Sequence, residues 1–133
     1  MKKILLVSSI LAICIQAQAG ERDHPACAAK ALEGDWVSYQ GTAQAGAPHT
    51  GVCRIHVEDG VATGDCDFSL GFTGPFQGAA TVNDDCSAEV TMDFAPAAFV
   101  SKFQLQLARN KQSFVGRWEN DFGANGIANG VKR

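Results

Sequence analysis

Few residues in this sequence have the chemistry for acid–base catalysis or metal binding, and their spacing matches no known catalytic motif. The histidines are His24, His49 and His56, and no H-E-x-x-H pair or other ligand spacing surrounds them. A nucleophile elbow of the G-x-S-x-G type is also absent from the sequence. We therefore expect three solvated surface histidines and no catalytic residue, metal or cofactor.

The acidic residues form short clusters at Glu58-Asp59, at Asp65 with Asp67, and at Asp84-Asp85. Paired carboxylates act as general acid and base, or hold Ca²⁺ when several oxygens converge from a loop. Two of the clusters have the composition of turns, the third alternates along a strand, and none has EF-hand spacing. We therefore expect these carboxylates to be solvated, with a small enzyme that uses carboxylates as the alternative hypothesis.

Five cysteines are present, and four of them follow the first twenty residues: Cys27, Cys53, Cys66 and Cys86. No C-x-x-C pair suggests a metal site. An even number of cysteines in a short exported chain predicts two disulfides.

The stretch around Asp59-Gly60 indicates which cysteines pair. This dipeptide favours a two-residue hairpin turn, because a type I′ turn needs positive φ at both central positions. Counting outward from the turn places Arg54 opposite Asp65, a favourable charge pair, and Cys53 opposite Cys66. The sequence therefore predicts a Cys53–Cys66 cross-strand disulfide and, by elimination, Cys27–Cys86.

The N-terminus has the three regions of a secretory signal peptide. Lys2 and Lys3 precede an apolar stretch from Ile4 to Ile15, and Ala17-Gln18-Ala19 is a typical cleavage site. Residues 1–19 are thus predicted to be removed and the protein to be periplasmic or secreted. Lipidation at Cys14 is the alternative, disfavoured because bulky Ile13 precedes it.

Residues 20–133 are long enough for one domain with one core. Loss of the two lysines leaves nine basic and fourteen acidic residues, a net charge of −5 with histidine neutral. An acidic surface repels phosphate backbones, so nucleic-acid binding is not expected. After residue 19 no apolar segment is long enough to insert in a membrane.

Alternation of apolar and polar residues predicts about eight short antiparallel strands. The clearest runs from Cys86 to Phe94, and another from Asp65 through Phe72 is ended by Gly74-Pro75. An alanine-rich segment, 23–34, predicts a short N-terminal helix. One apolar face per strand favours an all-β, up-and-down barrel, with a β-sandwich as the alternative.

The Gly34-Asp35-Trp36 sequence, a G-x-W at the start of the first expected strand, resembles the calycin group of lipocalins, avidins and small bacterial metalloprotease inhibitors. The later half of the chain is also similar to uncharacterised exported bacterial proteins. The calycin resemblance implies a non-enzymatic barrel that binds small apolar ligands, biotin or proteases. It also implies a basic residue packed on Trp36 from the last strand, for which Lys132 and Arg133 are the nearest equivalents.

These observations predict a non-catalytic exported binding protein whose partner is a small apolar molecule or another exported protein. The candidate ligand-binding residues are the large side chains of a barrel interior: Trp36, Tyr39, Met92 and Trp118. Two further hypotheses are an inhibitor of a protease or lysozyme, and a small enzyme with carboxylates at the barrel mouth.

Overall fold

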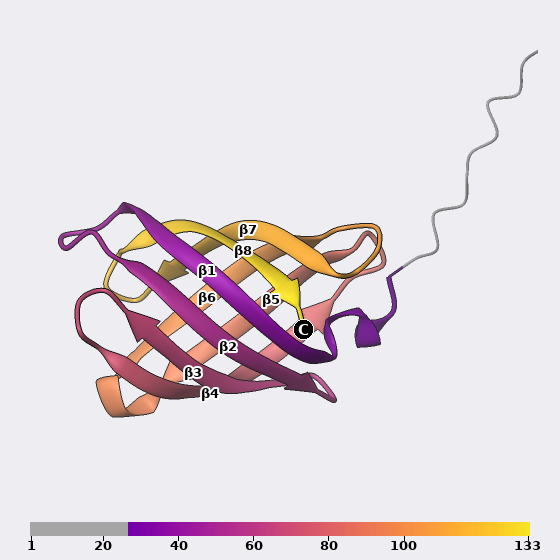
Figure 1. Cartoon of the computed structure of the whole chain (residues 1–133), viewed down its shortest axis with the longest axis horizontal. Coiled ribbons are helices and arrows are strands. Elements are labelled where there is room, and N and C mark those ends of the chain that lie inside the picture. Colours follow the sequence, from indigo (N-terminus) through magenta and orange to yellow (C-terminus); the bar gives the residue numbers. More distant parts are fainter. Residues whose placement is uncertain (1–26) are drawn as a thin grey trace, which may run out of the picture.

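A computed structural model describes residues 27–133 (Figure 1). The predicted signal peptide, the Cys14 alternative and His24 lie outside these residues. Eight antiparallel strands form a closed barrel in which each strand pairs with its neighbours in sequence and the last pairs with the first. The elements are η1 (Ala29–Leu32), β1 (Gly34–Gln44), β2 (Thr50–Glu58), β3 (Val61–Phe68), β4 (Thr73–Val82), β5 (Ser87–Phe94), η2 (Ala95–Ala97), β6 (Phe99–Leu107), β7 (Ser113–Asn120) and β8 (Asn125–Lys132).

The predicted hairpin and its register are confirmed. Asp59 and Gly60 both have positive φ, 48° and 77°, as a type I′ turn requires. Cys53 pairs with Cys66 and is bridged to it, with a Cα–Cα distance of 4.0 Å. The second predicted disulfide, Cys27–Cys86, is also present. Two such bridges are typical of proteins from an oxidising, extracellular compartment.

Across the outer face of the same hairpin, Arg54 forms the predicted ion pair with Asp65 at 2.8 Å. Arg54 also contacts Asp67 at 3.2 Å, and both carboxylates raise its pKa, chiefly through hydrogen bonds. All three side chains are about half exposed, so the network adds little stability and mainly supports the strand register.

The short N-terminal helix is confirmed, but in the described part of the expected segment 23–34 it is limited to the single 3-10 turn η1. Several contacts fix the conformation of this segment. The Cys27 N–H donates to the Asp84 carbonyl at 3.1 Å, and Trp36 Nε1 donates to the Leu32 carbonyl at 2.7 Å. A helix this short is marginal alone, so these contacts decide its conformation.

The strand predicted from Asp65 through Phe72 is confirmed only as far as Phe68. Strand β3 ends at Phe68, the chain turns, and β4 begins at Thr73 with Pro75 inside it. Pro75 is tolerated because it pairs only with Asp65 of β3, while the pairing of β4 with β5 begins further on, at Gln77. Strand β5 starts at Ser87 because Cys86 adopts positive φ in the preceding turn.

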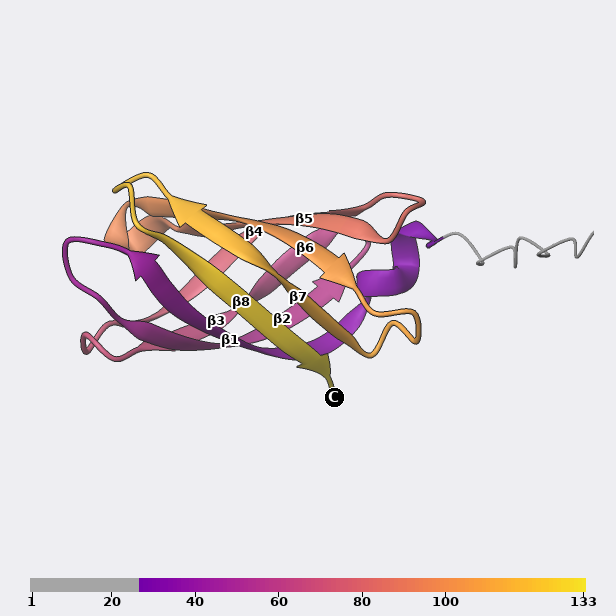
Figure 2. The same cartoon turned by 90° about the horizontal axis from the view of Figure 1, so that it is seen from above.

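The two ends of the barrel differ (Figures 1 and 2). The turn η1, the Asp59-Gly60 turn and the C-terminus lie at one end, called here the closed end. The β1–β2, β3–β4 and β7–β8 loops and η2 lie at the other, called here the mouth. Within the described residues, no helix has the length and apolarity needed to cross a membrane.

The closed half of the barrel is filled by side chains. Between them remains a space of only about 10 Å³, lined by Leu32, Trp36, Ser38, Ile55, Val57, Val90, Met92, Phe103, Leu105 and Phe114. Trp36 is 1% exposed, and the Lys132 ammonium lies 5.5 Å from its ring centroid. A basic residue of the last strand therefore packs on Trp36, as the resemblance to calycins implied. This packed half is a structural core.

Candidate functional site

The mouth of the barrel holds a pocket of about 170 Å³, called here the mouth pocket. Its walls come from four strands and three loops, and most of the side chains are aromatic. They are Gln40, His49, Phe68, Leu70, Phe72, Phe99, Ser101, Trp118, Asn120 and Phe122. An apolar cavity of about 150 Å³ is enough to hold a benzene ring. The mouth pocket therefore has room for a small aromatic molecule.

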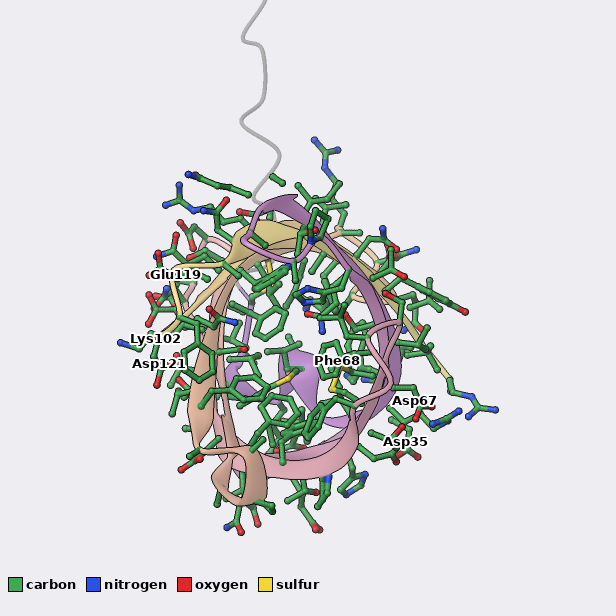
Figure 3. The ribbon with its side chains drawn as sticks, turned by 90° about the vertical axis from the view of Figure 1, so that its left-hand side faces the viewer. Asp35, Asp67, Phe68, Lys102, Glu119 and Asp121 are labelled. Atoms are coloured by element: carbon green, nitrogen blue, oxygen red, sulfur yellow. A yellow bond between two sulfur atoms is a disulfide. The ribbon has the colours of Figure 1, made fainter. Side chains whose placement is uncertain are left out.

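Aromatic rings form a continuous cluster at the floor and one wall of the mouth pocket. Phe94 and Phe99 stack with ring centroids 4.5 Å apart. Phe72 lies 5.9 Å from Phe99 and 5.7 Å from Phe68, which meets Phe94 edge-on. Figure 3 looks into the mouth and shows Phe68 inside the ring of strands. Rings at these spacings support one another and present a preformed apolar surface.

Strand pairing explains why Phe68 occupies the interior. Phe68 is the last residue of β3, and its partner on β2 is Gly51. A Cβ atom at Gly51 would lie 2.8 Å from Phe68 Cδ1 and 2.8 Å from Gln40 Nε2. The glycine therefore leaves the space in which the Phe68 ring and the Gln40 amide lie side by side.

His49 lies at the rim, on the β1–β2 loop. Its ring is 5.7 Å from Phe68 and 5.8 Å from Trp118, so it bridges opposite walls of the pocket. The backbone of His49 is bound to Thr42: its N–H donates to Thr42 Oγ1 at 3.0 Å, and its carbonyl accepts from the Thr42 N–H at 3.0 Å. His49 Nδ1 lies 3.0 Å from the carbonyl of Ala47 in the same loop. His49 is thus positioned as a partial roof.

Two polar atoms of the pocket side chains have no hydrogen-bond partner: Gln40 Oε1 and Trp118 Nε1. Gln40 is 7% exposed and Trp118 is 3% exposed. The Gln40 amide forms a weak hydrogen bond in which Nε2 donates to Cys53 Sγ at 3.7 Å. Leaving a buried polar atom unpaired costs about 1–3 kcal/mol, and native proteins carry few such atoms. Their presence on one pocket calls for a functional explanation.

Charged groups lie outside this pocket. None of its lining residues is Asp, Glu, Lys or Arg. Asn120 uses its Oδ1 to accept from the Phe122 and Ala124 N–H groups, which shapes the β7–β8 loop. Figure 3 shows Lys102, Glu119 and Asp121 on the outer wall of the barrel.

A second hollow of about 340 Å³ lies along β5–β8 on the outer wall. It is lined by side chains of both charge signs, among them Glu89, Lys102, Arg117 and Glu119. Arg117 is already engaged, because its Nε donates to Gln104 Oε1 at 2.7 Å. This hollow is polar and lies outside the core, so the mouth pocket is the stronger candidate for an apolar ligand.

His56 and Asp35 form a hydrogen-bonded pair on the outer wall, 2.8 Å apart. The bond to Asp35 raises the pKa of His56 above its ordinary value. Both side chains are at least half exposed and line neither hollow described above. Within residues 27–133, no group of three or more His, Cys, Asp or Glu side chains is arranged to hold a metal ion.

The four candidate ligand-binding residues occupy three different environments. Trp118 lines the mouth pocket, whereas Trp36 and Met92 lie in the packed closed half. Tyr39 points out of the barrel and is 52% exposed. An odd offset of three residues separates it from inward-facing Trp36, so strand alternation alone places them on opposite faces.

Sequence reasoning did not single out most of the mouth pocket. Of the residues that line it, the sequence predicted a binding role only for Trp118, and none for Gln40, His49, Phe68, Phe72 or Phe122. The aromatic content of the loops that end at the mouth was the available signal. It acquires meaning only when the three loops are known to meet at one end of the barrel.

Comparison with known proteins supports the fold alone. No protein-family profile matches the sequence, and no curated protein matches it either. Among solved structures, similarity is found to a designed fluorescence-activating β-barrel, with a TM-score of 0.61, 14% identity, and coverage of 79% of this chain and 96% of that one.

Two related barrels were solved with a bound compound. EF1p2_mFAP2b bound to DFHBI has a TM-score of 0.64, 14% identity, and coverage of 78% of this chain and 94% of that one. The redesigned barrel mFAP1 bound to DFHBI has a TM-score of 0.59, 16% identity, and coverage of 78% and 96%. At these identities the likeness establishes a shared small-barrel architecture.

Proposed function

We propose that this protein is an exported, non-catalytic binding protein that holds a small apolar molecule in the mouth pocket. The observation that carries the proposal is the contrast between the two halves of one barrel. The closed half is packed to about 10 Å³ of residual space, while the mouth keeps about 170 Å³ lined mainly by aromatic side chains. Side chains that served only as core would have closed that space.

Three further facts support binding without catalysis. The mouth pocket is lined by no carboxylate, although an enzyme of the kind considered above would need one there. Barrels of the same architecture bind a compound, DFHBI. The packing of Lys132 on Trp36 agrees with the resemblance to calycins, most of which bind a ligand or protein without catalysis.

The size of the pocket limits the ligand. Pockets for drug-sized molecules measure roughly 300–1,000 Å³, so 170 Å³ suits a molecule of one or two rings. A charged ligand would be buried without a counterion, because no lining side chain is Asp, Glu, Lys or Arg. The proposed ligand is therefore small, apolar and uncharged.

The test uses naphthalene as the probe and a variant that fills the pocket. Ser101 is 5% exposed and lines the pocket, so Ser101→Phe adds a ring about as large as the cavity accommodates. Val100→Phe is the matched control, because it adds the same ring one residue away, on the opposite face of β6. Equilibrium dialysis should show binding to the wild type and to Val100→Phe, and a loss of at least about tenfold in Ser101→Phe.

Thermal unfolding of both variants by circular dichroism controls for folding. Absence of naphthalene binding to the wild type would refute the proposal, as would equal binding to a folded Ser101→Phe variant. Native mass spectrometry of protein purified from its own host would then identify the natural ligand.

A protein partner is the second candidate, and one observation favours it. Leu70 and Phe122 stand at the rim of the mouth with 58% and 73% of their surface exposed. Exposed apolar residues of this kind often mark a docking surface. Inhibition of an exported protease or lysozyme by the wild type, lost in Leu70→Ser/Phe122→Ser, would support an inhibitor. Lack of inhibition across a panel of such enzymes would remove it.

A further inference from the structure

The two unpartnered polar atoms of the mouth pocket specify the ligand more narrowly, and this inference rests on the proposed function. We propose that the ligand is a flat aromatic molecule carrying one hydrogen-bond acceptor, which binds Trp118 Nε1, and one donor, which binds Gln40 Oε1. An indole N–H can only donate and an amide oxygen can only accept. The two atoms therefore require complementary groups on the same molecule.

The surroundings of Gln40 leave its oxygen available. Its nitrogen is directed to Cys53 Sγ at 3.7 Å, and that sulfur is held by the disulfide to Cys66. Gly51 also lies close to this nitrogen, because a Cβ at Gly51 would lie 2.8 Å from Gln40 Nε2. The disulfide and the backbone of Gly51 therefore both restrict the orientation of the amide.

Trp118 is held in a comparable way on β7, which only β8 separates from the β1 strand of Gln40. Its ring lies 6.5 Å from Phe103, at an interplanar angle of 32°, and 5.8 Å from His49. These two neighbouring rings restrict the indole and therefore the direction of its N–H. Trp118, Phe72 and Phe99 all line the pocket, so it offers aromatic rings on which a flat ligand can stack.

Each of these two atoms has less than 1 Å² of accessible surface. A ligand therefore reaches them only when a lining side chain shifts. His49 and Phe68 are the rings best placed to move, since His49 lies on a loop and Phe68 is the last residue of its strand. We expect binding to order the rim by fixing these two rings against the ligand.

Three probes of similar shape separate the two hydrogen bonds. Naphthalene offers neither group, quinoline offers an acceptor, and indole offers a donor. Dissociation constants are measured by equilibrium dialysis for the wild type, Trp118→Phe and Gln40→Met. The readout is the ratio of each probe's affinity to that of naphthalene within one protein. Differences in aqueous solubility cancel when these ratios are compared between variants.

The quinoline-to-naphthalene ratio should fall about threefold to tenfold in Trp118→Phe and stay unchanged in Gln40→Met. The indole-to-naphthalene ratio should fall by a similar factor in Gln40→Met and stay unchanged in Trp118→Phe. Each variant is thus the control for the other, and a general loss of pocket structure would weaken all three probes together.

Naphthalene binding with ratios that do not change in either variant would overturn this inference and leave the proposed function intact. Ratios that fall together in both variants would also overturn it, because the two atoms would then not act separately. Failure of all three probes to bind the wild type would overturn both proposals.

Discussion

The two disulfides should contribute unequally to stability, and the sequence separations in the structure give the difference. A disulfide stabilises the fold mainly by restricting the unfolded chain, and more so when it closes a longer loop. Cys27–Cys86 spans 59 residues and Cys53–Cys66 spans 13. With the chain-entropy relation, these separations correspond to about 4.2 and about 2.9 kcal/mol at 25 °C.

The perturbation is replacement of each pair by alanine, as Cys27→Ala/Cys86→Ala and as Cys53→Ala/Cys66→Ala. Three of the four cysteines are at most 2% exposed and Cys86 is partly buried, so the two replacements remove similar amounts of packed sulfur. Alanine is chosen over serine because a buried hydroxyl would add its own cost. The main difference between the two variants is then the loop-closure entropy that each disulfide removes from the unfolded chain.

Urea unfolding measures the free energy of each variant, with equal m-values required for the comparison. We expect the Cys27/Cys86 variant to lose about 1.3 kcal/mol more than the Cys53/Cys66 variant, following the loop lengths. A smaller loss for Cys27/Cys86 would refute the reasoning. It would mean that the segment from Cys27 to Leu32 is linked to the barrel without stabilising the folded state, despite the burial of Ala31 and Leu32.

Two further predictions follow from single sites. Gly51→Ala should weaken naphthalene binding about threefold or more with a stability loss of about 1 kcal/mol, because the new Cβ displaces the Phe68 ring and the Gln40 amide. Gly41→Ala is the control, because its Cβ would contact nothing within 4 Å. It should change neither the naphthalene affinity measured by dialysis nor the urea midpoint. Equal effects at both sites would contradict this prediction. Asp35→Asn should lower the His56 pKa, measured by NMR titration, because the bond to Asp35 raises it. Since the folded pKa is the higher one, the stabilisation is full below the ordinary value of 6.5 and disappears as pH rises through the His56 pKa. A stability difference that grows at alkaline pH would contradict the assignment.

Local sequence patterns determined most of the strands. Alternation placed Ala88, Val90, Met92 and Phe94 inside on β5, and the structure confirms it. The Asp59-Gly60 turn determined the register of β2 against β3 and with it one disulfide. Such features follow from the sequence because in–out alternation and two-residue turns depend only on neighbouring residues.

The errors occurred where tertiary contacts override local preference. The segment ending at Leu32 has the composition of a helix, yet a disulfide and the Trp36 indole hold it as a single turn. A proline is typical of a strand end, yet Pro75 lies inside β4. Pro75 pairs with Asp65 of β3 and has no pairing partner on β5. The Cys27–Cys86 bridge spans 59 residues, and the pairing of β4 with β5 involves a separate strand, so a window of a few residues shows neither of them.

By itself, the sequence determined the all-β class, the disulfide pairing and the inward face of the strands with the clearest alternation, such as β5. Only the tertiary structure decided that Trp36 belongs to a packed half and Trp118 to a pocket, although both point inward. Their heights along the barrel axis depend on the register of all eight strands together. Alternation states whether a side chain faces in or out, and closure of the sheet decides which distant loops it meets.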